Sequence, residues 1–233
     1  MKILIDGLNF ELAHGTGIKT FTRSAMTALA GSDHQLELLS ERIVRRIRHV
    51  SPFDSYVASL QAAPRGRIRL KRRLLMALSV LGSRFSGDFR VDDKQALKAI
   101  TGCHEWDYID GIRVRPSIFT KAFTRASLGL GMQSVSGCSD IDALLLTSPI
   151  PVYLPKKLNV LTVHDVIPLS HPRLIDRWEI IAKSFGSALD QGLKRADKVI
   201  CVSETTKHEL LKRFKVDEYK IDVIYQTCRY STV

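Results

Sequence analysis

The chain has 233 residues, of which 45% are hydrophobic and 25% are charged, and its formal net charge is +11. This composition predicts a globular protein with a sizeable core and excludes a mainly disordered chain. The N-terminus lacks a signal-peptide core, and the longest apolar stretch, residues 74–81, is too short to span a membrane. The four cysteines lack the spacing of a metal site or a disulfide framework. We therefore expect a cytoplasmic protein with free thiols.

The first 40 residues predict a strand, a loop, a helix and a second strand. Residues 2–7, KILIDG, form a short apolar run that ends at Asp6-Gly7. Residues 18–30 have the spacing of a helix that Gly31 ends, and residues 35–40 predict the next strand. The helix is expected to bury the face that carries Ile18, Phe21, Ala25, Ala28 and Leu29.

The loop before this helix contains the sequence HGTG, residues 14–17. Gly15 and Gly17 allow a tight turn and close approach of the backbone to a ligand. The free amides at the start of the helix favour an anion such as phosphate. The spacing is not that of a dinucleotide-binding fingerprint, and a plain glycine turn is the alternative interpretation.

The positive charge is concentrated between residues 42 and 90, which contain twelve Arg or Lys residues and two acidic residues. Arg65, Arg69, Arg72 and Arg73 share one side of a predicted helix, and leucines occupy another side. One interpretation is a membrane or acceptor patch that contacts anionic phospholipid. The alternatives are a core helix with a solvated basic end and a nucleic-acid contact, although no recognised nucleic-acid-binding module is evident.

The region from about residue 42 to 140 is poorly patterned, with one helix-like stretch at 92–101, whereas the C-terminal third is clear. Strands are predicted at 143–148, 158–165, 198–203 and 220–226, and helices at 173–196 and 204–214, the second capped by Ser203. Apolar strands that alternate with helices predict an α/β fold with a doubly wound, mostly parallel sheet. A basic, partly helical insertion at about 42–140 interrupts it.

Ligands of such sheets bind at the carboxyl ends of the strands. We therefore expect residues 14–17, Thr147-Ser148, His164-Asp165 and Ser203-Glu204 to gather at one edge.

The sequence LTVHDVIPLSHP, residues 161–172, ends a buried strand in His164 and Asp165. An imidazole both donates and accepts hydrogen bonds near neutral pH, so His164 is a candidate ligand contact. Alternatively, His164 caps its strand by bonding backbone, and Asp165 either orients the ring or serves the loop. No serine elbow is present, and the DID sequence at 140–142 precedes a strand, as solvated turn residues do. We expect no metal site.

Several motifs together resemble the N-terminal, Rossmann-like domain of GT-B glycosyltransferases of family 4. They are KILIDGLNFELAHGTGIKTFTRSAMTAL, NVLTVHDVIPLSHP, LKRADKVICVSETTKHELLKRF and KIDVIYQ, in that order along the chain. The resemblance covers residues 1–30 and 140–226. It implies a retaining transfer of a sugar from a nucleotide sugar, without a metal or other cofactor, by an acceptor-side domain that spans residues 1–225.

The resemblance also implies roles for particular residues. Gly15 and Gly17, with Thr16 between them, would approach the donor diphosphate. His164 would contact the donor sugar at the reacting centre with Asp165 beside it, and Ser203 and Glu204 would line the cleft. Family members with a similar HD-containing sequence are often mannosyltransferases of bacterial surface polysaccharides, such as lipopolysaccharide or exopolysaccharide. GDP-mannose is therefore the expected donor, with a lipid-linked or glycan acceptor at the inner membrane face.

In this family a second, donor-binding domain follows. We expect residues 226–233 to be the start of the interdomain linker and the second domain to lie outside this chain, with a separate C-terminal chain as one conceivable partner. The chain alone is then expected to have little transferase activity, because the departing diphosphate needs fixed positive groups. The alternatives are a non-catalytic split half that serves as a binding or partner module, and a basic nucleic-acid-binding α/β protein. We expect no nucleic acid as partner.

Overall fold

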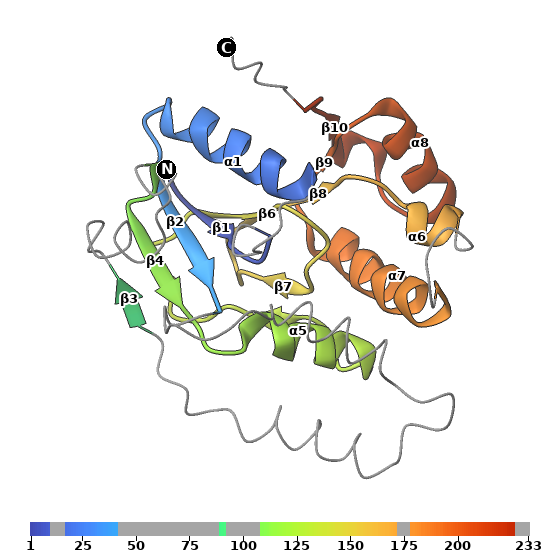
Figure 1. The fold of residues 1–233 in the computed structure, drawn as a ribbon, viewed down its shortest axis with the longest axis horizontal. Coiled ribbons are helices and arrows are strands. Elements are labelled where there is room, and N and C mark those ends of the chain that lie inside the picture. The colour runs from blue at the N-terminus through green and yellow to red at the C-terminus, as the bar shows by residue number, and fades with distance from the viewer. Residues whose placement is uncertain (10–16, 42–88, 92–107, 172–177, 227–233) are drawn as a thin grey trace.

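The computed structural model describes residues 1–9, 17–41, 89–91, 108–171 and 178–226, which form one eight-stranded sheet and a two-stranded one (Figure 1). The large sheet has the strand order β10-β9-β8-β6-β1-β2-β4-β3, in which only the edge strand β3 is antiparallel. Its strands are β1 (Lys2–Asp6), β2 (Gln35–Ser40), β3 (Phe89–Val91), β4 (Gly111–Val114), β6 (Ala143–Leu146), β8 (Leu158–Val163), β9 (Lys198–Cys201) and β10 (Ile221–Val223). The small sheet pairs β5 (Gln133–Ser134) with β7 (Val152–Tyr153).

Helices cover both faces of the large sheet, which confirms the predicted doubly wound α/β fold. In Figure 1, α1 (Gly17–Ala30) lies on one side of the sheet, and α5 (Ile118–Ser127) and α7 (Trp178–Arg195) lie on the other. The helix α8 (Glu204–Arg213) connects β9 to β10, and the short helix α6 (Ile167–Ser170) follows β8.

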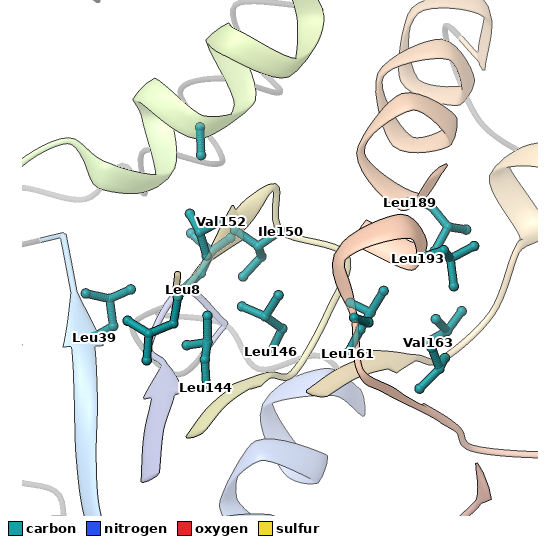
Figure 2. Close-up of a cluster of buried hydrophobic side chains, with 14 of the residues drawn as sticks. Leu8, Leu39, Leu144, Leu146, Ile150, Val152, Leu161, Val163, Leu189 and Leu193 are labelled. Atoms are coloured by element: carbon teal, nitrogen blue, oxygen red, sulfur yellow. The ribbon is translucent and has the colours of Figure 1, made fainter. Parts of the chain in front are cut away.

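The central strands are apolar on both faces because each face packs against helices. Ile3 and Ile5 of β1 join α1 residue Met26 in one core cluster. Leu4, between them, points to the other face, where Figure 2 shows Leu144, Leu161 and Leu189 of the second cluster. Burying each such side chain stabilises the fold by about 1.5–3 kcal/mol.

The buried face of α1 is shifted from the predicted one. Thr22 and Met26 are the fully buried residues of the helix, whereas Ala28 is exposed. A threonine can occupy this buried stripe because its hydroxyl donates to the Ile18 carbonyl, 2.9 Å away, which satisfies the polar group within the helix.

The weakly patterned middle of the chain contributes β4 and α5 to the sheet and its cover, which local sequence signals did not predict. The α5 N-terminus is capped by Glu41, which follows β2. The Glu41 carboxylate accepts hydrogen bonds from the backbone N–H groups of Phe119 and Thr120, at 2.9 and 3.1 Å. Because Glu41 lies 78 positions before Phe119, the sequence around the start of α5 contains no sign of this cap. The predicted helix at 92–101 lies outside the described residues.

Other predictions concern the cysteines and the membrane. Cys138 and Cys201 are buried and free, as expected; Cys103 and Cys228 lie outside the described residues. Within the described part of the chain, no helix has the length and apolar character needed to cross a membrane.

A cluster of charged side chains lies near the amino ends of β1, β2 and β4. Glu37 has a fully buried side chain and forms ion pairs with Lys2, at 2.8 Å, and with Arg113. Both cations also pair with the more exposed Asp140. Two cations around a desolvated carboxylate compensate for its burial, so this cluster ties three strands to the segment before β6.

We expect Glu37→Ala to lower the free energy of unfolding by about 3 kcal/mol, because it removes the buried carboxylate with which both poorly hydrated cations pair. Urea denaturation measures the change. Asp222→Ala is the matched control, since it breaks the exposed pair with Lys198, 3.1 Å apart, and should cost less than about 1 kcal/mol. Equal losses in the two variants would show that the buried cluster has no special role.

Candidate functional site

The carboxyl ends of β1, β6 and β8 lie side by side because these strands are parallel neighbours in the sheet. They bring Asp6, Thr147 and His164 to one edge. Hydrogen bonds connect the three residues, so this edge is a single polar assembly.

His164 is held by hydrogen bonds on both ring nitrogens. Its Nε2 lies 2.9 Å from the carbonyl oxygen of Thr147. A carbonyl can only accept, so Nε2 carries the proton and Nδ1 of the neutral ring is an acceptor. The amide nitrogen of Gln226, which follows β10, lies 3.1 Å from Nδ1 and donates to it. One tautomer therefore satisfies both contacts.

The surroundings of His164 favour its neutral form. Phe21 of α1 contacts the imidazole edge-on, with ring centroids 4.9 Å apart and an angle of 88° between the planes. Burial lowers the pKa of His164 below its usual 6.5, and the Thr147 carbonyl and the charge of Asp165 oppose the shift only in part. At neutral pH the ring therefore acts as a neutral donor and acceptor.

The backbone of His164 is anchored by the start of α8. The hydroxyl of Thr206 donates to the His164 carbonyl at 2.9 Å. Ser203 caps α8, as predicted, by accepting from the Thr206 N–H at 3.1 Å. The Ser203 hydroxyl therefore stabilises the start of α8 in addition to lying at the edge of the sheet. Glu204, in the first turn of α8, is exposed.

Asp165 serves the turn that follows β8. Its Oδ1 accepts from the N–H of Ile167 at 2.9 Å, which supports the start of α6. Both ring nitrogens of His164 bond other residues, so Asp165 acts on the ring through its charge.

Asp6 is a member of this edge that the predicted site did not include. Its side chain is 0% exposed, and Oδ2 accepts a hydrogen bond from the N–H of Thr147. Among the described residues, Oδ1 has no partner. Burial raises the pKa of Asp6 to about 6, although the backbone N–H and hydroxyl of Thr147 and the backbone N–H of Leu8 partly offset the effect. Its only sequence signal was an acid directly after an apolar strand.

A second polar contact crosses the same edge. Asn9, three residues after the end of β1, donates through Nδ2 to the hydroxyl of Ser148 at 2.8 Å, and both residues are buried. The expected gathering of Thr147-Ser148, His164-Asp165 and Ser203-Glu204 thus rests on a continuous set of contacts.

Other predicted residues are placed only in part. Gly17 opens α1, and a Cβ there would meet no atom within 4 Å, so packing by the described residues does not require a glycine. Gly15 and Thr16 lie outside the described residues. The same holds for the four arginines of the predicted membrane patch, Arg65, Arg69, Arg72 and Arg73.

The DID sequence lies at the amino end of β6, at the opposite edge from His164. Asp140 pairs with Lys2 and Arg113, and Asp142 accepts from the Lys2 backbone N–H at 2.8 Å. Both acids are exposed and Asp140 lies in a turn, as expected of solvated turn residues, and these contacts give them a structural role as well. In the described parts of the chain, no three His, Cys, Asp or Glu side chains lie close enough together to hold a metal ion.

Two cavities bear on the choice of site. One of about 560 Å³ lies at the amino edge, beside Tyr153, Lys156 and Arg195. A mostly apolar one of about 270 Å³ lies between α1 and the segment after β10, and includes the His164 neighbours Phe21 and Gln226. None of the predicted site residues that the structure describes lines the larger cavity, so the carboxyl edge is the better candidate site.

Asp6 predicts a specific dependence of stability on pH. Its pKa is about 6 in the folded state and near 3.8 in the unfolded state, so its protonation stabilises the fold below pH 3.8. This contribution is lost as the pH rises through 6, and its full size is about 3 kcal/mol. The free energy of unfolding of the wild type minus that of Asp6→Asn should fall by about this amount between pH 4 and 7.5. A constant difference in urea denaturation across this range would contradict the raised pKa.

Comparison with known protein families gives one match, which covers the C-terminal part of the chain. Residues 139–227 match the model of the family described as Glycosyltransferase Family 4, from just before β6 to just after β10. The match includes Thr147, His164, Ser203 and Gln226. No curated protein matches the chain. This C-terminal part of the chain is therefore similar to a family 4 glycosyltransferase domain of the GT-B type, and it belongs to a Rossmann-like, mostly parallel sheet.

Proposed function

We propose that the chain contributes the acceptor-side half of a retaining glycosyltransferase, with the carboxyl edge around His164 as one wall of the active site. The family match over residues 139–227 supports transfer of a sugar from a nucleotide sugar to an acceptor. The observation that carries the proposal is the state of His164: a neutral imidazole whose Nδ1 is an acceptor at the ligand edge of the sheet.

A neutral imidazole is suited to a sugar. Nδ1 can accept a hydrogen bond from a hydroxyl, the most abundant polar group of a hexose, whereas an unprotonated nitrogen repels a phosphate oxygen. Gln226 makes the same kind of contact that a hydroxyl would make, through its amide N–H at 3.1 Å. Because Gln226 is exposed, a ligand can replace it at little cost.

The diphosphate of the donor would approach the start of α1. Gly17 is the first residue of that helix, and the start of a helix favours an anion. Because no described atom lies where a Cβ of residue 17 would be, a ligand rather than packing against the described residues is the proposed reason for the glycine. Gly15 and Thr16 would complete this loop, Asp165 would stand beside the sugar, and Ser203 and Glu204 would line the cleft.

We further propose GDP-mannose as the donor and a glycan or lipid-linked acceptor of surface polysaccharide synthesis, by resemblance to family members with a similar histidine motif. The basic segment at residues 42–90 supports a peripheral position on an anionic, cytoplasmic membrane face. The alternative is a non-catalytic half that binds a sugar or a partner chain without turnover.

The test incubates the chain with GDP-[¹⁴C]mannose and a bacterial lipid extract, alone and with a separately produced donor-binding domain of a family 4 enzyme. We expect label transfer in the mixture and little with the chain alone, since the donor-binding domain supplies the positive groups for the diphosphate. Turnover by the chain alone would contradict the half-enzyme proposal. Binding of GDP-mannose without transfer in either case favours the binding module.

The Gly17→Ala variant distinguishes an effect on donor binding from an effect on folding. We expect the free energy of unfolding to change by less than about 1 kcal/mol, because the added methyl meets no described atom. Binding of GDP-mannose, followed by calorimetry, should weaken at least about tenfold because the methyl occupies the space of the diphosphate.

Gly31→Ala is the matched control, at the other end of α1. A Cβ there makes ordinary contacts of 3.5 and 3.6 Å, so both stability and binding should stay near wild type. Unchanged binding in Gly17→Ala would remove this loop from the donor site.

A further inference from the structure

A buried carboxyl group lies behind His164 without touching it. Asp6 accepts from the N–H of Thr147, and the carbonyl of the same Thr147 accepts from His164 Nε2 at 2.9 Å. Thr147 is therefore the only residue between the carboxyl group and the imidazole along this path.

Thr147 needs an external support to hold this position. β6 ends at Leu146, and the last ladder pairs of that strand are Ile5 with Leu145 and Leu146 with Leu161. Beyond this point the sheet no longer orients the peptide groups. On the β1 side, the Asp6 side chain accepts a hydrogen bond from the Thr147 N–H. On the β8 side, His164 donates to the Thr147 carbonyl.

The fold alone does not account for a carboxyl group at position 6. Asp6 is fully buried, and among the described residues neither its Oδ1 nor the buried Thr147 hydroxyl makes a hydrogen bond of normal geometry. The Thr147 hydroxyl and the Leu8 N–H lie near enough to lower the pKa of the carboxyl group in part, but they do not satisfy Oδ1. Burying a carboxyl group with one unpaired oxygen opposes folding. Burial also raises the pKa of Asp6, and buried groups of this kind concentrate at functional sites.

We propose that Asp6 is a positioning residue for His164. By holding the N–H of Thr147, it fixes the carbonyl that keeps His164 in the Nε2–H tautomer and leaves Nδ1 as the acceptor for a ligand hydroxyl. The assignment of a sugar ligand to Nδ1 rests on the proposed function, whereas the hydrogen bonds from Asp6 through Thr147 to the ring do not depend on it.

The experiment follows the ring nitrogens and the Nε2 proton of His164 by ¹⁵N NMR, with the signals assigned through a His164→Gln variant. Asp6→Asn keeps an acceptor oxygen, and Asp6→Leu removes it while it fills the space. In the wild type and Asp6→Asn we expect an unprotonated Nδ1 and a slowly exchanging Nε2 proton. In Asp6→Leu we expect ring shifts averaged over both tautomers and proton exchange at least about tenfold faster.

Asn159→Leu is the matched control. Asn159 is also buried and accepts from a backbone N–H, that of Leu154 at 2.7 Å, but at the amino end of β8. It should lower stability while the His164 signals stay as in the wild type. Wild-type His164 signals in Asp6→Leu would overturn the proposal, as would an equal change in Asn159→Leu. If Asp6→Leu does not fold, the Asp6→Asn variant decides. Wild-type ring signals with a slowly exchanging Nε2 proton in that variant would support the positioning role of Asp6, and altered tautomer signals would overturn it.

A second readout separates this proposal from the proposed function. GDP-mannose is added to the wild type and to Asp6→Leu, and its affinity is measured by calorimetry. Weaker binding in the variant, together with the changed His164 signals, supports both proposals. Changed signals with no binding by either protein support the positioning role and contradict the donor assignment.

Discussion

The hydrogen bond from His164 Nε2 to the Thr147 carbonyl is the contact on which the rest of the edge depends. It exists because β6 and β8 are parallel neighbours, so the residues after them emerge at the same end of the sheet. It also decides the chemistry of the ring, because a donor at Nε2 makes Nδ1 an acceptor. Contacts from α1, α8 and the segment after β10 then fix where that acceptor lies.

The two edges of the sheet carry polar groups of opposite character. At the amino edge, the buried Glu37 is matched by the cations of Lys2 and Arg113, an arrangement that holds strands together. At the carboxyl edge, Asp6 is buried with one oxygen that has no hydrogen-bond partner among the described residues, an arrangement that opposes folding. Buried titratable groups of this kind concentrate at functional sites, which supports our proposal that this edge binds a ligand.

The sequence predicted those features that depend on local patterns. The apolar runs located the central strands, and their alternation with helices predicted a doubly wound, mostly parallel sheet. Ser203 was correctly placed as the α8 cap. Asp6, Gln226 and the Glu41 cap were not predicted. They bond residues 141, 62 and 78 positions away, respectively, and no periodicity or local motif records such contacts. The buried face of α1 was also displaced, because a threonine that bonds its own helix can replace an apolar residue.

Amide chemical-shift mapping of the isotope-labelled chain during addition of GDP-mannose tests most directly whether the carboxyl edge around His164 is the ligand site. We expect the largest shifts at Gly17, Thr147, His164 and Gln226, and no change at Lys156 and Asp197 at the opposite edge. Shifts concentrated around Tyr153, Lys156 and Arg195, beside the larger cavity, would contradict it.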